Sequence, residues 1–131
     1  LRGECERQNE VFFHFMRTKL PFTVLKYAMT LDGKTATVLG KSQWITGEAA
    51  RKRVHEDRGR YMAILTGVST VLADNPQLTC RIPGGKNPIR VIADTKLRTP
   101  LSSTVVQTAR ETPTWIVTEE RRHMRTAAVV F

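Results

Sequence analysis

The sequence predicts an α/β protein built around a mostly parallel sheet. Three short segments rich in β-branched and aromatic residues predict strands, at residues 61–65, 89–93 and 114–117. Helical segments are predicted before and between them, at residues 46–59 and 68–73. Parallel neighbours need a crossover connection, so an alternation of strands and helices is typical of a parallel sheet.

The N-terminal part of the chain predicts a helix over residues 1–19. Cys5, Phe12, Phe15 and Met16 fall at helical spacing, and Pro21 disfavours a helical residue before it. Residues 22–28 then predict a further strand, because β-branched and aromatic side chains dominate them. Asp32-Gly33 is a strong turn signal, after which residues 34–39 form either a short paired strand or a loop.

The remaining elements follow from caps, apolar runs and breakers. Thr46 is expected to cap a helix that stops near Gly59. The nearly continuous apolar run at 61–65 predicts a strand buried on both faces. Asp74-Asn75-Pro76 should end the short helix at 68–73, and residues 83–88 form a loop by composition.

Composition bounds the class of protein. The chain has 131 residues, 40% hydrophobic and 25% charged, which fits one globular domain and excludes disorder, and no apolar stretch is long enough to cross a bilayer. It begins at Leu1 and ends on an apolar run, so we expect a fragment of a longer chain. The net charge of +9 indicates either an anionic partner or a basic surface. The basic residues are scattered and have no aromatic residues between them, which disfavours nucleic acid as the partner. A phosphorylated substrate and a phosphorylated cofactor would account for the positive charge equally well.

Cysteines and histidines give no sign of a metal site. Cys5 and Cys80 are far apart and no C-x-x-C pair exists, which favours two reduced thiols in a cytoplasmic protein. His14, His55 and His123 stand in unrelated polar contexts and are expected at the surface.

Three segments could carry chemistry, each with a structural alternative. Thr66–Thr70 follows a strand and could hold a phosphate at a helix start, although Ser and Thr also cap helices in any protein. Arg81 could fork onto a phosphate or lie free at the surface, and Trp44 could pack in a core or against a flat heterocycle. A standard dinucleotide fingerprint, a Ser-His-Asp set and paired carboxylates are all missing, which is compatible with hydride transfer, since that reaction needs positioning more than side-chain acids.

Taken together, four segments in register resemble the bifunctional riboflavin-biosynthesis deaminase–reductase family. They are residues 26–36, 40–46, 64–79 and 88–94, and the resemblance extends from 21 to about 118. It implies a dihydrofolate-reductase-like sandwich around a mostly parallel sheet, incomplete in this chain. On this basis residues 1–20 would be the C-terminal helix of a preceding deaminase domain with its linker, and residues 21–131 the N-terminal part of the reductase domain.

The resemblance also implies an activity and a set of site residues. The activity would be NADPH-dependent reduction of 5-amino-6-(5-phosphoribosylamino)uracil to its ribitylamino form, by hydride transfer to the carbon of an opened ribose. Lys26 would touch that ribose and could supply a proton. The resemblance assigns Ala28, Trp44, Thr70, Asp74 and Thr95 to the cofactor, and Ser42, Arg58, Leu78 and Arg81 to the substrate, with the two arginines on its phosphate. No metal is implied, because zinc belongs to the deaminase domain, and the family's later glycine-rich cofactor segment is also missing from the sequence.

Two alternatives stay open beside this interpretation. Another reductase of the same fold could act on a pterin, but a pterin has no phosphate for Arg58 and Arg81. A non-catalytic binding module of the same fold is disfavoured because Lys26, Ser42 and Asp74 are retained with them. The expected partners are therefore a phosphorylated pyrimidine and, when the protein is full length, further copies of itself, with neither nucleic acid nor a membrane.

Overall fold

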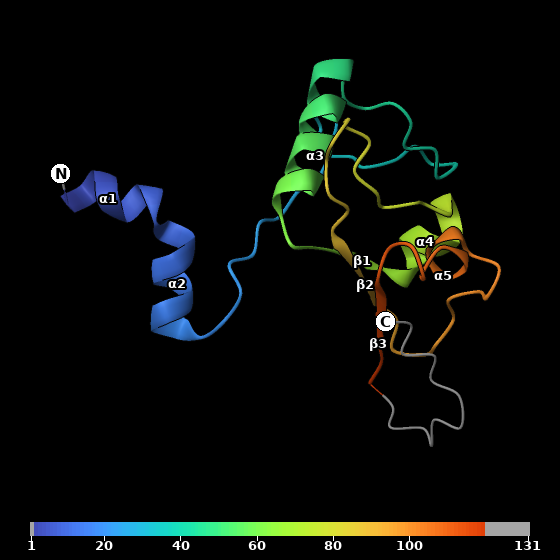
Figure 1. The fold of residues 1–131 in the computed structure, drawn as a ribbon. Coiled ribbons are helices and arrows are strands. Elements are labelled where there is room, and N and C mark those ends of the chain that lie inside the picture. Colours follow the sequence, from blue (N-terminus) through green and yellow to red (C-terminus); the bar gives the residue numbers. More distant parts are fainter. Residues whose placement is uncertain (1, 120–131) are drawn as a thin grey trace. The chain divides into compact units, whose positions relative to one another are not determined.

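The computed structural model describes residues 2–119 and divides the chain into two compact units, Leu1–Thr46 and Gly47–Phe131 (Figure 1). The first unit holds two helices and an irregular segment, and the second holds the sheet. Among the described helices, none is both long and apolar enough to span a bilayer.

Two helices, not one, form the N-terminal part of the first unit. α1 covers Arg2–Gln8 and α2 covers Glu10–Thr18, so the single helix predicted over residues 1–19 is wrong. The break falls at Asn9, whose side-chain Nδ2 donates to the Cys5 carbonyl at 2.9 Å. An asparagine side chain that bonds the nearby backbone competes with helical geometry, and Asn9 accordingly has a non-helical ψ of 21°.

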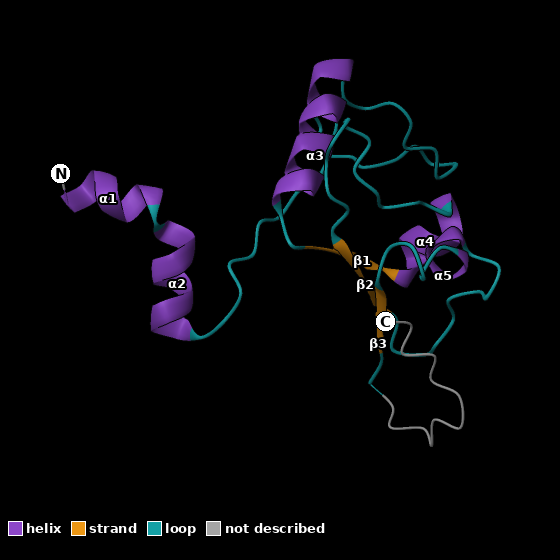
Figure 2. Ribbon diagram, in the orientation of Figure 1, coloured by secondary structure: helices purple, strands orange, loops and turns teal. Residues whose placement is uncertain are grey.

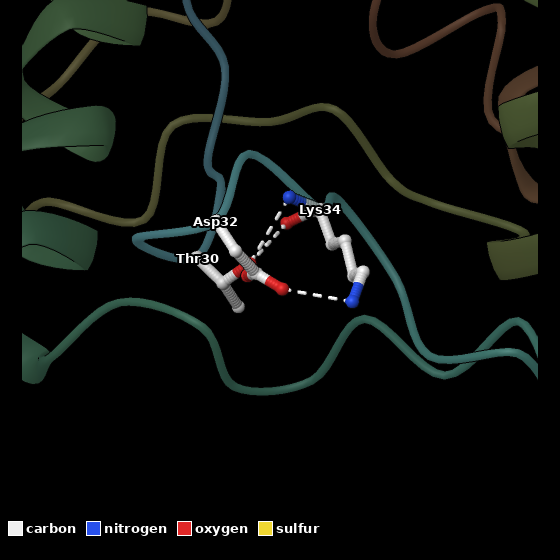
Figure 3. A network of polar contacts seen from close by, with 3 residues as sticks. All are labelled: Thr30, Asp32 and Lys34. Atoms are coloured by element: carbon white, nitrogen blue, oxygen red, sulfur yellow. Dashed lines mark hydrogen bonds and ion pairs between the residues drawn. The ribbon is translucent and has the colours of Figure 1, made fainter.

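Residues 21–46 contain turns but no strand, which corrects the strand predicted at 22–28. A strand needs a hydrogen-bonded neighbour, and the described residues offer none to this segment. The predicted turn at Asp32-Gly33 is confirmed (Figure 3), with Gly33 at a φ of +78°. Thr30 Oγ1 donates to the Asp32 carboxylate, and Lys34 Nζ lies 2.8 Å from Asp32 Oδ2. The hydrogen bonds from Lys34 and Thr30 lower the pKa of Asp32.

The second unit is an α/β arrangement with a parallel sheet, as predicted (Figure 2). Its elements are α3 (Glu48–Arg60), β1 (Ala63–Gly67), α4 (Val68–Asp74), β2 (Ile89–Ala93), α5 (Thr104–Gln107) and β3 (Thr114–Val117). The strand order is β1-β2-β3, and both pairs are parallel. The carboxyl ends of all three strands therefore lie at one edge of the sheet.

Several local predictions need correction. The N-cap of α3 is Gly47 rather than Thr46, and α5 was not predicted. The strand predicted at 61–65 runs from Ala63 to Gly67 and is not buried on both faces: Ile64 and Thr66 are half-buried, whereas Leu65 is 70% exposed. One face of the strand packs on a helix and the opposite face is open within the described residues, so an apolar run did not mean two buried faces.

The core lies on the covered face of the sheet. It combines the middle of β2, two residues of α4, one of α5 and one from the loop after α4, namely Ile92, Val68, Val71, Val105 and Leu78. Two charged residues, Arg90 and Asp94, are fully buried beside it. Burying a charge is costly unless its hydrogen bonds are made, so both side chains need partners.

Candidate functional site

One face of α3 is joined to the irregular segment that follows α4. His55 and Arg58 are three residues apart, so they share a face of the helix. Arg58 Nη1 donates to the Thr79 carbonyl at 3.3 Å, and the Cys80 thiol donates to the His55 carbonyl at 3.3 Å. The Arg81 amide donates to His55 Nδ1, also at 3.3 Å. This α3 face therefore holds the backbone of residues 79–81.

Two arginines, Arg58 and Arg81, lie near each other at this junction. Burial lowers the pKa of Arg58, and the positive charge of Arg81 lowers it further. Nε of Arg58 is buried and has no hydrogen-bond partner in the described part of the chain. Neither arginine forms an ion pair with a carboxylate of residues 2–119. Two close cations with spare donors form a site suited to an anion with several oxygens, such as a phosphate.

An open pocket of about 400 Å³ lies beside this junction. Its lining includes His55 and Cys80 but neither Arg58 nor Arg81, so the pocket does not include the two arginines. The space around Cys80 is tight, because a Cβ at Gly85 would approach its sulfur to 2.5 Å. The glycine is thus required by packing against the thiol.

The second group of predicted site residues lies on α4 and after β2. Thr70 is half-buried in α4 and Asp74 is exposed at the last residue of that helix. Gly67 ends β1, and a Cβ placed there would meet open space. The Asp74 side chain makes no hydrogen bond within the described residues, whereas its neighbour Asn75 accepts from the Thr104 amide at 2.8 Å. Asn75, not Asp74, therefore fixes this turn.

Thr95 stands in a loop that Asp94 organises at the carboxyl end of β2. Asp94 Oδ2 accepts from the amide and the hydroxyl of Thr99, each at 2.7 Å. The Thr95 carbonyl accepts from Thr118 Oγ1 at 3.1 Å, while the residue itself is exposed. Burial alone would raise the pKa of Asp94, but hydrogen bonds from Arg98 and Thr99 and the charge of Arg98 hold it below its ordinary value. The loop thus presents an exposed threonine on an anchored backbone.

The other predicted site residues lie in the first unit or in the core. Lys26, Ser42 and Trp44 are exposed and Ala28 is half-buried, all in the irregular segment of the first unit. Leu78 is only 6% exposed, packs in the hydrophobic core and has a φ of +56°. Its side chain has no free surface for a substrate, so the contact predicted for Leu78 would have to come from its backbone.

Sequence reasoning missed three residues that shape these sites. His55 was expected at the surface but is half-buried against Arg81, and its helical spacing with Arg58 was the available signal. His14 is also half-buried, 5.6 Å from the Phe22 ring, while His123 lies outside the described residues. Arg90 and Asp94 are both buried, and the side-chain hydrogen bonds of Arg90 reach residues 13 to 22 positions away, which no local pattern predicts.

Comparison with known proteins places these features in a family. Residues 21–130 match the family model described as the RibD C-terminal domain. A curated relative from Actinobacillus pleuropneumoniae, riboflavin biosynthesis protein RibD, is 54% identical over 118 residues, covering 90% of this chain and 31% of the relative. The protein of the same name from Bacillus amyloliquefaciens is 53% identical, covering 90% of this chain and 32% of the relative. The chain thus spans about a third of the length of these relatives.

Solved structures agree with this result. The crystal structure of a diaminohydroxyphosphoribosylaminopyrimidine deaminase/5-amino-6-(5-phosphoribosylamino)uracil reductase from Thermotoga maritima matches with a TM-score of 0.79 and 45% identity, over 92% of this chain and 34% of that one. Riboflavin biosynthesis reductase Rib7 of Saccharomyces cerevisiae matches with a TM-score of 0.57 and 26% identity, over 82% of this chain and 51% of that one. The chain therefore belongs to the RibD C-terminal domain family.

Proposed function

We propose that the chain is part of an NADPH-dependent reductase of riboflavin biosynthesis. Its substrate would be 5-amino-6-(5-phosphoribosylamino)uracil, reduced to the ribitylamino form. The observation that carries the proposal is the Arg58–Arg81 pair in a chain of this family, because two nearby guanidinium groups with no carboxylate partner among residues 2–119 suit a substrate phosphate. A pterin reductase of the same fold would have no use for that pair.

The residues of the second unit fit one side of a cofactor site. Gly67, with open space over it, and the exposed Thr95 lie at or just after the carboxyl ends of β1 and β2, where ligands of open α/β sheets bind. The helix that ends at Asp74 begins at this edge. Asp74 can accept hydrogen bonds from ribose hydroxyls, and Thr70 and Thr95 can donate to the cofactor. When bound, NADPH would supply the hydride. Ala28 and Trp44 are further residues that we propose for the cofactor.

The protein's own part in the reaction would be to bind and orient. Arg58 and Arg81 hold the phosphate end of the substrate, and Ser42 and the Leu78 backbone contact the rest of it. Lys26 contacts the opened ribose, where it would donate a proton to the heteroatom bonded to the sugar carbon that is reduced. Holding two reactants in register can itself contribute a large part of the rate enhancement, without a covalent intermediate.

The proposal extends to the rest of the longer protein. Residues 1–20 would end a preceding deaminase domain. α2 supports this, because Phe12, Phe15 and Met16 are 59%, 50% and 49% exposed and would be covered by such a domain. The full-length protein would be a cytoplasmic homo-oligomer, and the free thiols of Cys5 and Cys80 are in keeping with a reducing compartment.

The test is NADPH oxidation by the full-length protein. We expect turnover with the phosphoribosylamino-pyrimidine and none with dihydrofolate. The matched control is the same pyrimidine with its phosphate removed, which should be a poorer substrate. Equal turnover of dihydrofolate would favour the pterin reductase, and binding of both ligands without NADPH oxidation would favour a non-catalytic module.

A further inference from the structure

His55 makes a contact that the proposed catalytic scheme does not use. Its Nδ1 accepts the backbone amide of Arg81 at 3.3 Å. An imidazole nitrogen can accept a hydrogen bond only while it carries no proton. Burial, then the positive charges of Arg58 and Arg81, lower the pKa of His55, opposed by a hydrogen bond with the Thr79 backbone. The imidazole therefore stays neutral near pH 7 and keeps its acceptor.

The backbone that carries Arg81 has no secondary structure of its own. Three successive residues are instead held by three side chains. Arg58 donates to the Thr79 carbonyl at 3.3 Å, the Asn87 Oδ1 accepts from the Cys80 amide at 2.9 Å, and His55 accepts from the Arg81 amide. His55 is the contact that acts on Arg81 directly. It also joins Arg81 to the helix that carries Arg58.

We propose that His55 is a positioning residue for phosphate recognition, because it fixes the backbone of Arg81 and so keeps this residue near Arg58. The role rests on the proposed function, in which these two arginines hold the substrate phosphate. The Arg81 side chain is exposed and has no ion-pair partner among residues 2–119, so only its backbone is anchored. A long side chain on an anchored backbone loses less freedom when it binds than one on a mobile loop.

Other side chains near His55 do not take over its contact with the Arg81 amide. Cys80 donates its thiol to the His55 carbonyl, and Glu56 and Arg60 line the same pocket as His55. None of them contacts the Arg81 amide. A test of the proposal should therefore remove the hydrogen-bond acceptor Nδ1 and change the rest of the side chain as little as possible.

Two amide substitutions separate the acceptor from the rest of the side chain. In His55→Asn the amide oxygen can lie where Nδ1 lies, whereas in His55→Gln it is one carbon further away. Both are made in the full-length protein, and kcat and KM are measured with the phosphorylated pyrimidine and with its dephosphorylated form. His14→Gln in α2 is the matched control, because it alters a half-buried histidine of the first unit.

We expect His55→Gln to raise KM for the phosphorylated substrate by about 3- to 10-fold, the size of one neutral hydrogen bond. Its kcat should stay within about twofold, and the dephosphorylated substrate should be unaffected. His55→Asn should recover most of the loss, and His14→Gln should change neither constant. If His55 were merely structural, His55→Gln would instead lower kcat/KM by the same factor for both substrates.

The outcomes distinguish the two levels of the proposal. Suppose that the wild-type protein prefers the phosphorylated substrate and that His55→Gln keeps the full preference. This result overturns the role of His55 alone. A wild-type protein with no such preference overturns the phosphate assignment of the two arginines. If His55→Gln does not fold, the KM of His55→Asn decides: wild-type values support the acceptor role, and a KM raised for both substrates overturns it.

Discussion

Two arginines of the second unit, the buried Arg90 and the half-buried Arg58, use their hydrogen-bond donors in opposite ways. Arg90, on β2, donates to the carbonyls of Gln77, Val105, Thr108 and Thr112 and to the Thr108 hydroxyl, at 2.6–3.1 Å. Arg58, on α3, makes a single hydrogen bond within residues 2–119, to the Thr79 carbonyl. Burial is the first cause of a lowered pKa in both. A nearby Glu111 partly offsets it at Arg90, whereas Arg81 adds to it at Arg58.

The difference separates an arginine that holds the fold from one that can hold a ligand. Arg90 donates to carbonyls in α5, just after it and in the segment before β3, so most of its donors are used. Both arginines have a buried Nε without a partner among the described residues, but Arg58 makes far fewer hydrogen bonds there than Arg90 and lies near a second cation, Arg81. Unused donors beside unneutralised charge are the physical sign of a binding group, because leaving them unpaired has a cost that a ligand can remove.

The strongest test of this comparison is Arg90→Met. The change keeps much of the side-chain volume but removes all the hydrogen bonds that Arg90 donates. We expect the free energy of unfolding to fall by about 3 kcal/mol or more, since a hydrogen bond that involves a charged group contributes about 1.5–3 kcal/mol. Urea denaturation measures it. Arg58→Met is the matched control and should cost far less stability. An equal loss for both variants would contradict the distinction.

The converse test is Arg58→Ala and Arg81→Ala in the full-length protein. Each should lower kcat/KM for the phosphorylated substrate by about 10- to 100-fold, because a charge-assisted hydrogen bond contributes about 1.5–3 kcal/mol. Lysine should rescue only in part, since it keeps the charge and loses the fork. Steady-state kinetics with the dephosphorylated substrate give the control. If both substrates lose the same factor, the arginines act structurally, like Arg90.

A third test extends the comparison to the carboxylates. Asp74 is exposed and makes no described hydrogen bond, so Asp74→Ala should leave the melting temperature nearly unchanged. We expect it to weaken NADPH binding by about tenfold, which corresponds to about 1.4 kcal/mol, and to alter substrate binding less. Fluorescence titration of NADPH measures the affinity. A lower melting temperature with unchanged NADPH affinity would assign Asp74 to the turn.

The smallest expected effect concerns Asp94 and pH. Its pKa is lower in the folded protein than in the unfolded chain, so its carboxylate adds stability above the unfolded pKa. That contribution is lost as pH falls through the folded pKa. Asp94→Asn should therefore cost about 1 kcal/mol at pH 7, and the difference from wild type should shrink as pH drops below the ordinary aspartate range. Denaturation at several pH values tests this, and a constant difference would contradict it.

Local patterns predicted the second unit better than the first. β2 and β3 have the predicted bounds, and α4 lies within one residue of its prediction, because each is a short apolar segment between clear breakers. The strand expected at 22–28 is not formed within the described residues, since a strand depends on a partner that its own sequence does not contain. The helix over 1–19 was split by Asn9, whose side-chain bond to Cys5 is a local effect that helical spacing alone does not reveal.

By itself the sequence determined the fold class and the order of the three strands with the helices α3 and α4 in the second unit. These properties follow from side-chain pattern and turn residues that lie close together along the chain. Only the tertiary structure decided that Arg90 is internal, that Leu78 packs in the core, and that His55 holds Arg81. His55 and Arg81 are 26 residues apart, and such a contact depends on how α3 packs against a loop, which no local pattern encodes.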